Sequence, residues 1–240
     1  MSGLADRTVM ITGASRGLGE ALARQFARAG ARVSICARNG DRLEEIADSV
    51  RRDGGVCLTA ALDVTDETAV GEWAQSTERT LGCPDVLINN ASLLGPRVPL
   101  STYPLDRWRE VIDVNLTGAL IVSAAVIPLM RSARGGSIIN VSSGAAHGER
   151  EEWGAYAVSK AALERLSFNL ATELDGSGVR VNVVDPGAMR TEMRAAAYPK
   201  EDPLTLKTPL ETTGVFLWLA GDAAIAITGR RFSADEFRTP

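Results

Sequence analysis

The sequence predicts an α/β fold in which a doubly wound parallel sheet carries helices on both faces. Short apolar, strand-like segments alternate with longer helical segments along the whole chain, which is typical of such sheets. A glycine-rich turn joins the first of these strands to the first helix. The 240 residues, 45% of them hydrophobic and 23% charged, show no internal repeat or linker, so we expect one domain over residues 1–240.

The apolar patterns give the expected elements in order. Strands are expected at residues 7–11, 32–37, 56–62, 86–89, 137–142 and 179–184, with a short last strand at 230–233. Helices are expected at residues 17–29, 40–52, 67–81, 105–131, 154–175 and 210–220. Right-handed crossovers then bring all strand ends to one edge, and ligands of such sheets bind beyond the carboxyl ends of the strands.

The first strand leads directly into the turn TGASRGLG, residues 12–19. Leu18, Leu22 and Phe26 follow at helical spacing, so the turn opens a helix. Glycines allow the backbone to turn sharply and to approach a pyrophosphate, and the free N–H groups of the helix start face the phosphates. The turn therefore predicts a dinucleotide site of the Rossmann type.

Tyr156 and Lys160 are four residues apart, so they share one face of the helix expected there. A tyrosine ionises near pH 10, and its use as an acid/base near neutrality needs a pKa lower by roughly three units, on the order of 4 kcal/mol. The lysine ammonium on the next turn favours the phenolate. Ser143 precedes the tyrosine by thirteen residues and ends another expected strand.

Three further motifs stand at or beyond the ends of other expected strands, and a fourth lies within the helix expected at 105–131. The first three are Asp63-Val64, Asn89-Asn90-Ala91, and Pro186-Gly187 followed by Thr191, and the fourth is Asn115 within VNLTG. Together with the glycine turn and the Ser143, Tyr156 and Lys160 set, they resemble the short-chain dehydrogenase/reductase family. Seven motifs occur in the family's order, and the resemblance covers about residues 5–235.

The resemblance implies roles for four catalytic residues. Tyr156 donates a proton to a substrate carbonyl oxygen during reduction and takes one from the alcohol in the reverse direction. Ser143 hydrogen-bonds that oxygen and orients it. Lys160 lowers the pKa of the tyrosine and binds the nicotinamide ribose, and Asn115 interrupts its helix through an ordered water that links Lys160 to solvent.

The same resemblance implies a set of cofactor-binding residues. These are Gly13, Ser15, Arg16, Gly17, Leu18, Gly19, Arg38, Asp63, Val64, Asn90, Ala91, Tyr156, Lys160, Pro186, Gly187 and Thr191. An acidic residue at the end of the second strand would bind the ribose diol of NAD, but Ala37 stands there and Arg38 follows. Arginine binds a phosphate with two parallel hydrogen bonds, and Arg16 can approach the same group, so we expect NADP(H).

The substrate is expected to be a ketone, an aldehyde or a 3-oxoacyl compound of largely apolar character. Ser143, Trp153, Ala188 and Met189 are the candidate substrate residues, and the segment at about residues 189–209 is expected to cover the substrate. Arg190 and Arg194 leave an anionic tail as an alternative. The chain departs from the family pattern in three places. Ser92 replaces a glycine, the covering segment is rather short and carries Pro199, Pro203 and Pro209, and the C-terminal end lacks the usual Asp-Gly-Gly.

Three functional classes are compatible with these residues. The first is an NADPH-dependent oxidoreductase that interconverts a carbonyl and an alcohol. The second is a non-catalytic NADP-binding sensor, although such proteins usually lose the tyrosine or the lysine. The third is a lyase or epimerase that uses the same tyrosine, although such chains are often longer in the substrate region.

Composition argues against several other classes. The net charge of −4 disfavours a nucleic-acid partner, and a single histidine with three scattered cysteines predicts no metal site. Free thiols and the absence of a signal-like N-terminus favour a cytoplasmic protein. The most apolar run, residues 118–130, is too short to span a membrane. The long apolar helix around it predicts a homo-oligomer, a tetramer or a dimer.

Overall fold

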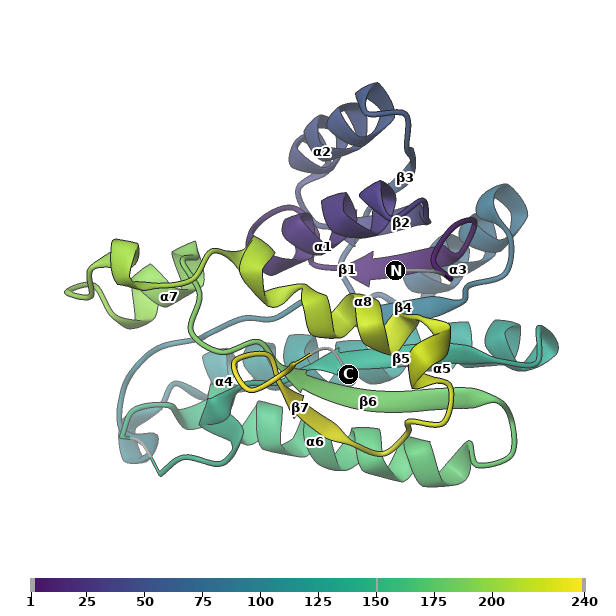
Figure 1. Ribbon diagram of the computed structural model, residues 1–240. Helices are drawn as coiled ribbons and strands as arrows, with labels where there is room; N and C mark the ends of the chain where they lie inside the picture. Colours follow the sequence, from purple (N-terminus) through teal and green to yellow (C-terminus); the bar gives the residue numbers. More distant parts are fainter. Residues whose placement is uncertain (1–2, 150, 239–240) are drawn as a thin grey trace.

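The computed structural model describes residues 3–149 and 151–238, and its centre is a seven-stranded parallel sheet (Figure 1). The spatial order is β3-β2-β1-β4-β5-β6-β7, so the chain first winds outward to β3 and then returns past β1 to wind the other way. The strands are β1 (Thr8–Thr12), β2 (Arg32–Ala37), β3 (Val56–Ala61), β4 (Val86–Asn89), β5 (Gly136–Val141), β6 (Val179–Asp185) and β7 (Arg231–Ser233). The predicted doubly wound parallel sheet is confirmed.

Helices cover both faces of the sheet. One face carries α1 (Gly17–Arg28), α2 (Gly40–Arg52) and α8 (Gly214–Ala220). The other carries α3 (Glu67–Leu81), α5 (Gly118–Ser132) and α6 (Gly154–Glu173). Successive strand residues point to opposite faces, so Val9 and Ile11 pack under α1 and α8 while Met10 packs toward α3 and α5.

The local signals in the sequence account for most element boundaries. Asn39 accepts the N–H of Arg42 and starts α2, and Asp66 accepts the N–H of Ala69 and starts α3. Every expected strand lies within one residue of its observed bounds. The expected helices at 40–52 and 67–81 have the observed bounds.

The structure differs from the sequence expectation in three helical regions. The helix expected at 105–131 is α4 (Leu105–Ile112) joined to α5 by a π-helical turn at Asp113–Thr117. The helix expected at 210–220 begins as a 3₁₀ turn, Pro209–Thr212, because Thr208 and Glu211 form a capping box before α8. The helix α7 (Glu192–Ala197) was not expected, since six residues are too short to show a helical period.

The α4–α5 segment is also the most apolar long helix. By length and composition, Leu105–Ser132 could cross a membrane, and 39% of its most apolar window is buried. Helices in the core of soluble proteins pass the same test. Here Val122, Val126 and Met130 of α5 pack on the sheet with α3 and α6, so one side of this helix belongs to the core.

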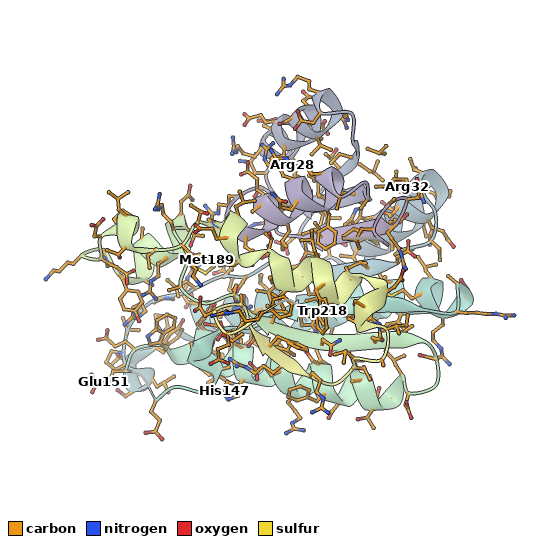
Figure 2. The ribbon with its side chains drawn as sticks, in the orientation of Figure 1. Arg28, Arg32, His147, Glu151, Met189 and Trp218 are labelled. Carbon is orange, nitrogen blue, oxygen red and sulfur yellow. The ribbon has the colours of Figure 1, made fainter. Side chains whose placement is uncertain are left out.

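The carboxyl ends of the strands define the functional edge. Figure 1 shows α7 projecting beyond this edge. Figure 2 labels Met189 on this side and Arg32 on the opposite side, where β2 begins. The sheet therefore presents its strand ends to the segment that precedes and includes α7.

Candidate active site

A cleft of about 1410 Å³ lies at the carboxyl edge of the sheet. Most of the residues singled out in the sequence line it. They are Gly13, Ser15, Arg16, Gly17, Leu18, Arg38, Asp63, Val64, Asn90, Ala91, Ser143, Trp153, Tyr156, Lys160, Pro186, Gly187, Ala188, Met189 and Thr191. Gly19 and Asn115 are not among the residues that line the cleft.

The glycine turn is packed so closely that side chains are excluded. Gly13 has a φ of +65°, and a Cβ there would lie 2.7 Å from the Cα of Ala91. A Cβ on Gly19 would lie 2.4 Å from the carbonyl oxygen of Gly13. The amide of Asn90 fixes the turn by donating to the carbonyl oxygens of Thr12, at 2.9 Å, and Gly13, at 3.1 Å. The turn is thus held against β4 at the cleft floor.

The start of α1 has the features of a phosphate site. Arg16 occupies the N-cap and makes no side-chain cap hydrogen bond, so the first N–H groups of this 12-residue helix are open to a ligand. Ser92 also lines the cleft, but its hydroxyl oxygen is inaccessible to solvent and has no hydrogen-bond partner within the described part of the chain, so it gives no evidence for a ligand. The open N–H groups at the start of α1 fit a bound dinucleotide.

Three guanidinium groups surround the end of the cleft near β2. Arg16 pairs with Glu192 of α7, and Arg38 lies 4.0 Å from a carboxylate oxygen of Asp63. Arg42, which the sequence analysis missed, also lines the cleft. Arg16 and Arg38 are 68% and 63% exposed, so their ion pairs with carboxylates are weak and open to exchange for a phosphate. Ala37 leaves this end without an acid at the position expected for an NAD-specific carboxylate.

Ser143, Tyr156 and Lys160 meet on the opposite side of the cleft. Ser143 follows β5, and its hydroxyl accepts the N–H of Ala145 at 3.2 Å. Tyr156 and Lys160 lie one turn apart on the buried face of α6, with the Nζ atom of Lys160 5.7 Å from the tyrosine ring centre. Lys160 donates to the carbonyl oxygen of Val141 at 2.8 Å, so the strand end and the helix are joined beneath the serine.

Burial dominates the ionisation of this pair. Desolvation raises the pKa of Tyr156 to about 12, although its hydrogen bond with Ser143 acts in the opposite direction and the Asp185 carboxylate adds a further rise. Desolvation lowers the pKa of Lys160 to about 8. Desolvation therefore outweighs the other influences on Tyr156, because both groups lose water when α6 packs on the sheet, and the lowering of the tyrosine pKa by the lysine stays a prediction.

Asn115 is buried in the π-helical turn between α4 and α5. Its side-chain oxygen accepts the N–H of Leu93 at 2.7 Å, and its amide nitrogen donates to the Leu93 carbonyl at 2.9 Å and the Ser159 hydroxyl at 3.0 Å. The π-helical turn interrupts the helix at Asn115, which the family resemblance implied and the apolar pattern did not. The side chain, however, clamps the loop after β4 to α6, and the proton relay to Lys160 stays a prediction.

The substrate side of the cleft is apolar. Trp153 contacts Tyr156 in a tilted arrangement with ring centres 5.6 Å apart, and Leu94, Met193 and Ala197 complete this wall. Ala188 and Met189 line the cleft beside Gly187.

The two arginines considered for an anionic tail are engaged elsewhere. Arg194 holds Glu201 with two contacts of 2.6 and 2.7 Å, and Arg190 donates to the carbonyl oxygens of Pro203 and Leu206. Both side chains therefore shape the segment around α7 and leave the apolar wall without a free cation from this pair.

Sequence reasoning missed three charged residues next to the elements that carry Ser143, Tyr156 and Lys160. Asp185 ends β6 and lines the cleft, and Arg231 of β7 joins it to the buried Glu164 of α6. Asp185 directly precedes Pro186, and Glu164 lies one turn beyond Lys160, so their positions gave a signal. Arg231 gave none, because only the folding of β7 beside β6 brings it there.

Comparisons with known proteins identify the family. The family model for short chain dehydrogenases matches residues 7–202. The chain belongs to this family. The oxidoreductase YciK of Escherichia coli is 36% identical over 99% of this chain and 95% of its own length. The 2,3-dihydro-2,3-dihydroxybenzoate dehydrogenase of Bacillus subtilis is 34% identical over 89% of this chain and 83% of its own length.

Solved structures agree with this assignment. A short-chain dehydrogenase of Shigella flexneri 2a, complexed with NADP, superposes with a TM-score of 0.92 at 35% identity, covering 96% of this chain and 98% of that one. The resemblance drawn from the motifs is confirmed, and this short-chain dehydrogenase is an oxidoreductase by family. Within the described residues, no three His, Cys, Asp or Glu side chains gather in a way that could hold a metal ion.

Proposed function

We propose that this short-chain dehydrogenase is an NADPH-dependent oxidoreductase that reduces a ketone, an aldehyde or a 3-oxoacyl group to an alcohol, or runs the reverse reaction. The observation that carries the proposal is the meeting of Ser143, Tyr156 and Lys160 in the cleft that also holds the glycine turn. The same cleft thus holds the expected dinucleotide site and a side chain that can donate a proton to a substrate oxygen.

The residues act on the substrate oxygen in this proposal. NADPH, when bound, supplies the hydride. The hydroxyls of Ser143 and Tyr156 donate hydrogen bonds to the carbonyl oxygen, where negative charge develops during reduction, and Tyr156 gives up its proton. Since the pKa of Tyr156 is raised by burial, the side chain is protonated at neutral pH and ready to act as the acid. The charge of Lys160 then stabilises the resulting phenolate.

The cofactor preference rests on the arginines near β2. The 2′-phosphate of NADP(H) would replace the carboxylates that now contact Arg16 and Arg38, with Arg42 close by. The Shigella flexneri relative complexed with NADP supports this preference.

The substrate class rests on the wall formed by Leu94, Trp153 and Met193. Apolar side chains bind by excluding water, and the few polar groups fix orientation. We therefore favour a medium-sized, largely apolar substrate bound next to Ser143 and Tyr156. The Bacillus subtilis relative is named for a cyclic diol that also carries a carboxylate, so its name supports a ring substrate and keeps an anionic group as the alternative.

A spectrophotometric screen tests the proposal. Purified protein is mixed with NADPH and a panel of ketones, aldehydes, 3-oxoacyl thioesters and free sugars, and the loss of NADPH absorbance is followed. We expect turnover with one or more apolar carbonyl compounds. NADPH binding without turnover on any of them would support a sensor, and product formation without NADPH consumption would support a lyase or epimerase.

We further propose a cytoplasmic homo-oligomer that binds neither nucleic acid nor membrane. Free Cys36, Cys57 and Cys83 fit a reducing compartment. Exposed apolar side chains on α4–α5 and α6, among them Leu120 and Val158, fit a contact between subunits. The family resemblance implies that these helices pair across a two-fold axis.

A further inference from the structure

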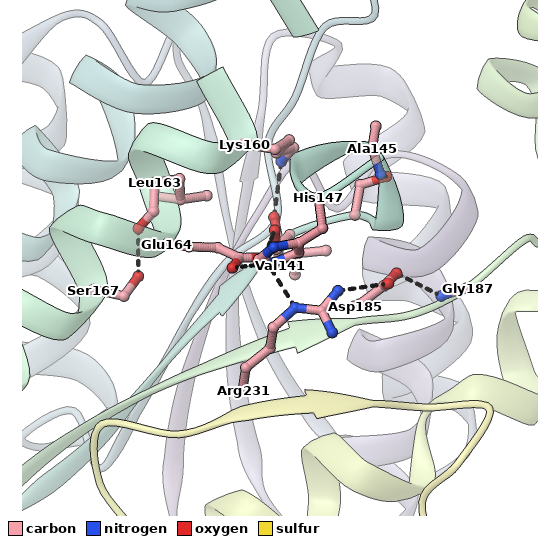
Figure 3. A network of polar contacts seen from close by, with 12 residues as sticks. Val141, Ala145, His147, Lys160, Leu163, Glu164, Ser167, Asp185, Gly187 and Arg231 are labelled. Carbon is pink, nitrogen blue, oxygen red and sulfur yellow. Dashed lines mark hydrogen bonds and ion pairs between the residues drawn. The ribbon is translucent and has the colours of Figure 1, made fainter. Parts of the chain in front are cut away.

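The atypical C-terminal end places an arginine next to Asp185, one of the residues that line the cleft. Arg231 of β7 lies between two carboxylates that belong to different elements (Figure 3). Its Nε atom lies 3.1 Å from Glu164 of α6, and its Nη2 atom lies 2.9 Å from Asp185 at the end of β6. The side chain is 29% exposed, so the pairing is partly shielded from water.

Glu164 is the buried centre of this group. Its side chain is 4% exposed, and it accepts hydrogen bonds from the Ser142 hydroxyl at 2.5 Å and from Arg231. The ring of His147, in the loop after Ser143, lies 2.7 Å from its other oxygen. Glu164 thereby holds the residue before the catalytic serine and the loop that follows it.

Asp185 extends the chain of contacts to the other side of the cleft. One carboxylate oxygen accepts the N–H of Gly187 at 3.0 Å, and the other accepts from Arg231. Gly187 belongs to the Pro-Gly turn that lines the cleft. A continuous set of charged contacts therefore joins the Ser142–His147 loop to this turn.

Removing Arg231 from these contacts is expected to be costly in free energy. A buried carboxylate that loses its cation is strongly destabilised, and it regains water or a partner only by moving. Loss of Arg231 would leave Glu164 and Asp185 without their shared cation. The segments that carry Ser143 and Gly187 would then shift relative to each other.

We propose that Glu164 and Arg231 are positioning residues, which fix the catalytic serine and the Pro-Gly turn in one arrangement. This inference rests on the function proposed above. It assigns a role to the C-terminal strand, where this sequence lacks the family's Asp-Gly-Gly. Glu164 and Arg231 do not take part in hydride or proton transfer themselves. They act through their contacts with Ser142 and Asp185.

The test compares two arginines of similar geometry. Arg231→Gln removes the cation between Glu164 and Asp185. Arg7→Gln removes a cation that likewise joins two carboxylates, Asp85 and Asp222, and is 31% exposed. Arg7 lies at the opposite edge of the sheet, where β1 and β4 begin. Its partners Asp85 and Asp222 are 35% and 63% exposed, so it reports the loss of a more exposed two-carboxylate set away from the cleft.

We expect Arg231→Gln to lower kcat by about tenfold with a small change in KM for the carbonyl, because a misplaced serine acts mainly on the transition state. NADPH affinity, measured by fluorescence titration, should fall several-fold. Arg7→Gln should retain both values while its melting temperature falls. Equal kcat and NADPH affinity in wild type, Arg231→Gln and Arg7→Gln would overturn the proposal.

A second set of variants keeps the proposal testable if Arg231→Gln does not fold. Arg231→Lys retains a charge but reaches one carboxylate at a time, so it should recover part of kcat. Glu164→Gln should lower kcat by itself, and Glu164→Gln combined with Arg231→Lys should cost less than the sum of the two. If the loss of kcat in the double variant equals the sum of the two single losses, Glu164 and Arg231 do not act as one positioning unit.

The outcomes also separate this inference from the proposed function. If the wild type binds NADPH but reduces no carbonyl in the screen, the proposed function fails. NADPH affinity still tests the contact chain in that case, because Asp185 holds the Gly187 N–H without any turnover. If the wild type is active and Arg231→Gln is equally active and binds NADPH equally, only the positioning role fails.

Discussion

At the scale of single residues, the site combines buried ionisable groups with exposed ones. Tyr156 and Lys160 are 8% and 1% exposed, and desolvation moves their pKa values in opposite directions, to about 12 and about 8. Arg16 and Arg38, in contrast, are largely exposed at the other end of the cleft. The buried pair is therefore suited to proton transfer, and the exposed pair to binding a charged ligand.

The cofactor preference can be reversed at the end of β2. Ala37→Asp combined with Arg38→Gln should move the ratio of kcat/KM values from NADPH toward NADH by at least about tenfold. The new carboxylate repels a 2′-phosphate and can accept hydrogen bonds from a ribose diol. Arg28→Gln, at the far end of α1, is the control. An unchanged ratio in the double variant would place phosphate recognition on other residues.

Replacing Lys160 should stabilise the fold while activity is lost. A lysine whose folded pKa of about 8 lies below its ordinary value of 10.5 destabilises the folded state while it is protonated. The full cost, about 3 kcal/mol, applies below pH 8 and disappears as the pH rises toward 10.5. Replacing Lys160 removes this cost, but the loss of its hydrogen bond to Val141 reduces the resulting stabilisation by about 1 kcal/mol.

Calorimetry at two pH values measures this effect. Lys160→Met should melt about 4 °C above the wild type at pH 7, and the difference should shrink at pH 10. Lys200→Met changes an exposed lysine and should leave the melting temperature unchanged. A Lys160→Met protein that melts below the wild type by the same amount at both pH values would contradict the assigned cost of burial.

At the scale of elements, the close contact between α1 and the turn before it limits what position 19 can hold. Gly19→Ala would place its Cβ against backbone atoms of Gly13 and Ala14, so neither side can yield without a backbone shift. We expect a loss of about 1–3 kcal/mol in the free energy of unfolding and weaker NADPH binding.

Gly71→Ala is the matched control for this prediction. Gly71 lies within α3, and an added Cβ meets nothing within 4 Å. Alanine should therefore stabilise the helix by about 0.5–1 kcal/mol. Urea unfolding and fluorescence titration with NADPH measure both quantities. Equal stability of Gly19→Ala and wild type would show that the turn is not tightly packed.

The sequence predicts some elements better than others for physical reasons. Long strands and helices carry a period of two or 3.6, and caps such as Asn39 and Asp66 mark where helices start. The π-helical turn at Asn115 leaves no trace in this period, because one added residue shifts the pattern only slightly. The helix α7 has six residues and no buried face. Its position depends on contacts such as Arg194 with Glu201, which are far from any periodic signal.

At the scale of the whole molecule, the sheet brings distant motifs to one edge. Gly13, Asn90 and Ser143 follow three different strands, and the parallel order of the strands makes them neighbours. This part of the site could be predicted from the sequence, because the positions of the strand ends and the order of the strands are enough to bring these residues together. The set of Glu164, Arg231 and Asp185 was not, because it depends on side-chain contacts between α6, β7 and β6.

The outer faces of α4–α5 and α6 predict assembly. Leu105, Leu120 and Val158 are 66%, 44% and 43% exposed, which leaves apolar surface without a cover in one chain. Light scattering at micromolar concentration should give a dimer or tetramer of the 25.5 kDa chain. Leu120→Glu with Val158→Glu should shift it to smaller species, because a buried contact would then hold unpaired charges.

Leu204→Glu provides the control for assembly. Leu204 is 75% exposed, and it belongs to the 3₁₀ turn Pro203–Thr205 after α7 and to none of these helices. It should leave the mass unchanged. A clean monomer for the wild type would refute the assembly, and an unchanged oligomer in the double variant would place the contact elsewhere.

The most direct test of the central claim follows the hydride itself. NADPH carrying deuterium at the transferable position is incubated with the protein and the carbonyl compound that gives most turnover, and the alcohol is analysed by mass spectrometry. We predict that deuterium from the cofactor is found on the new carbinol carbon with the wild type. Tyr156→Phe, which keeps the ring and loses the proton, should bind NADPH and transfer deuterium at least about a hundredfold more slowly. Bound NADPH without deuterium in any product, or full transfer by Tyr156→Phe, would contradict the account.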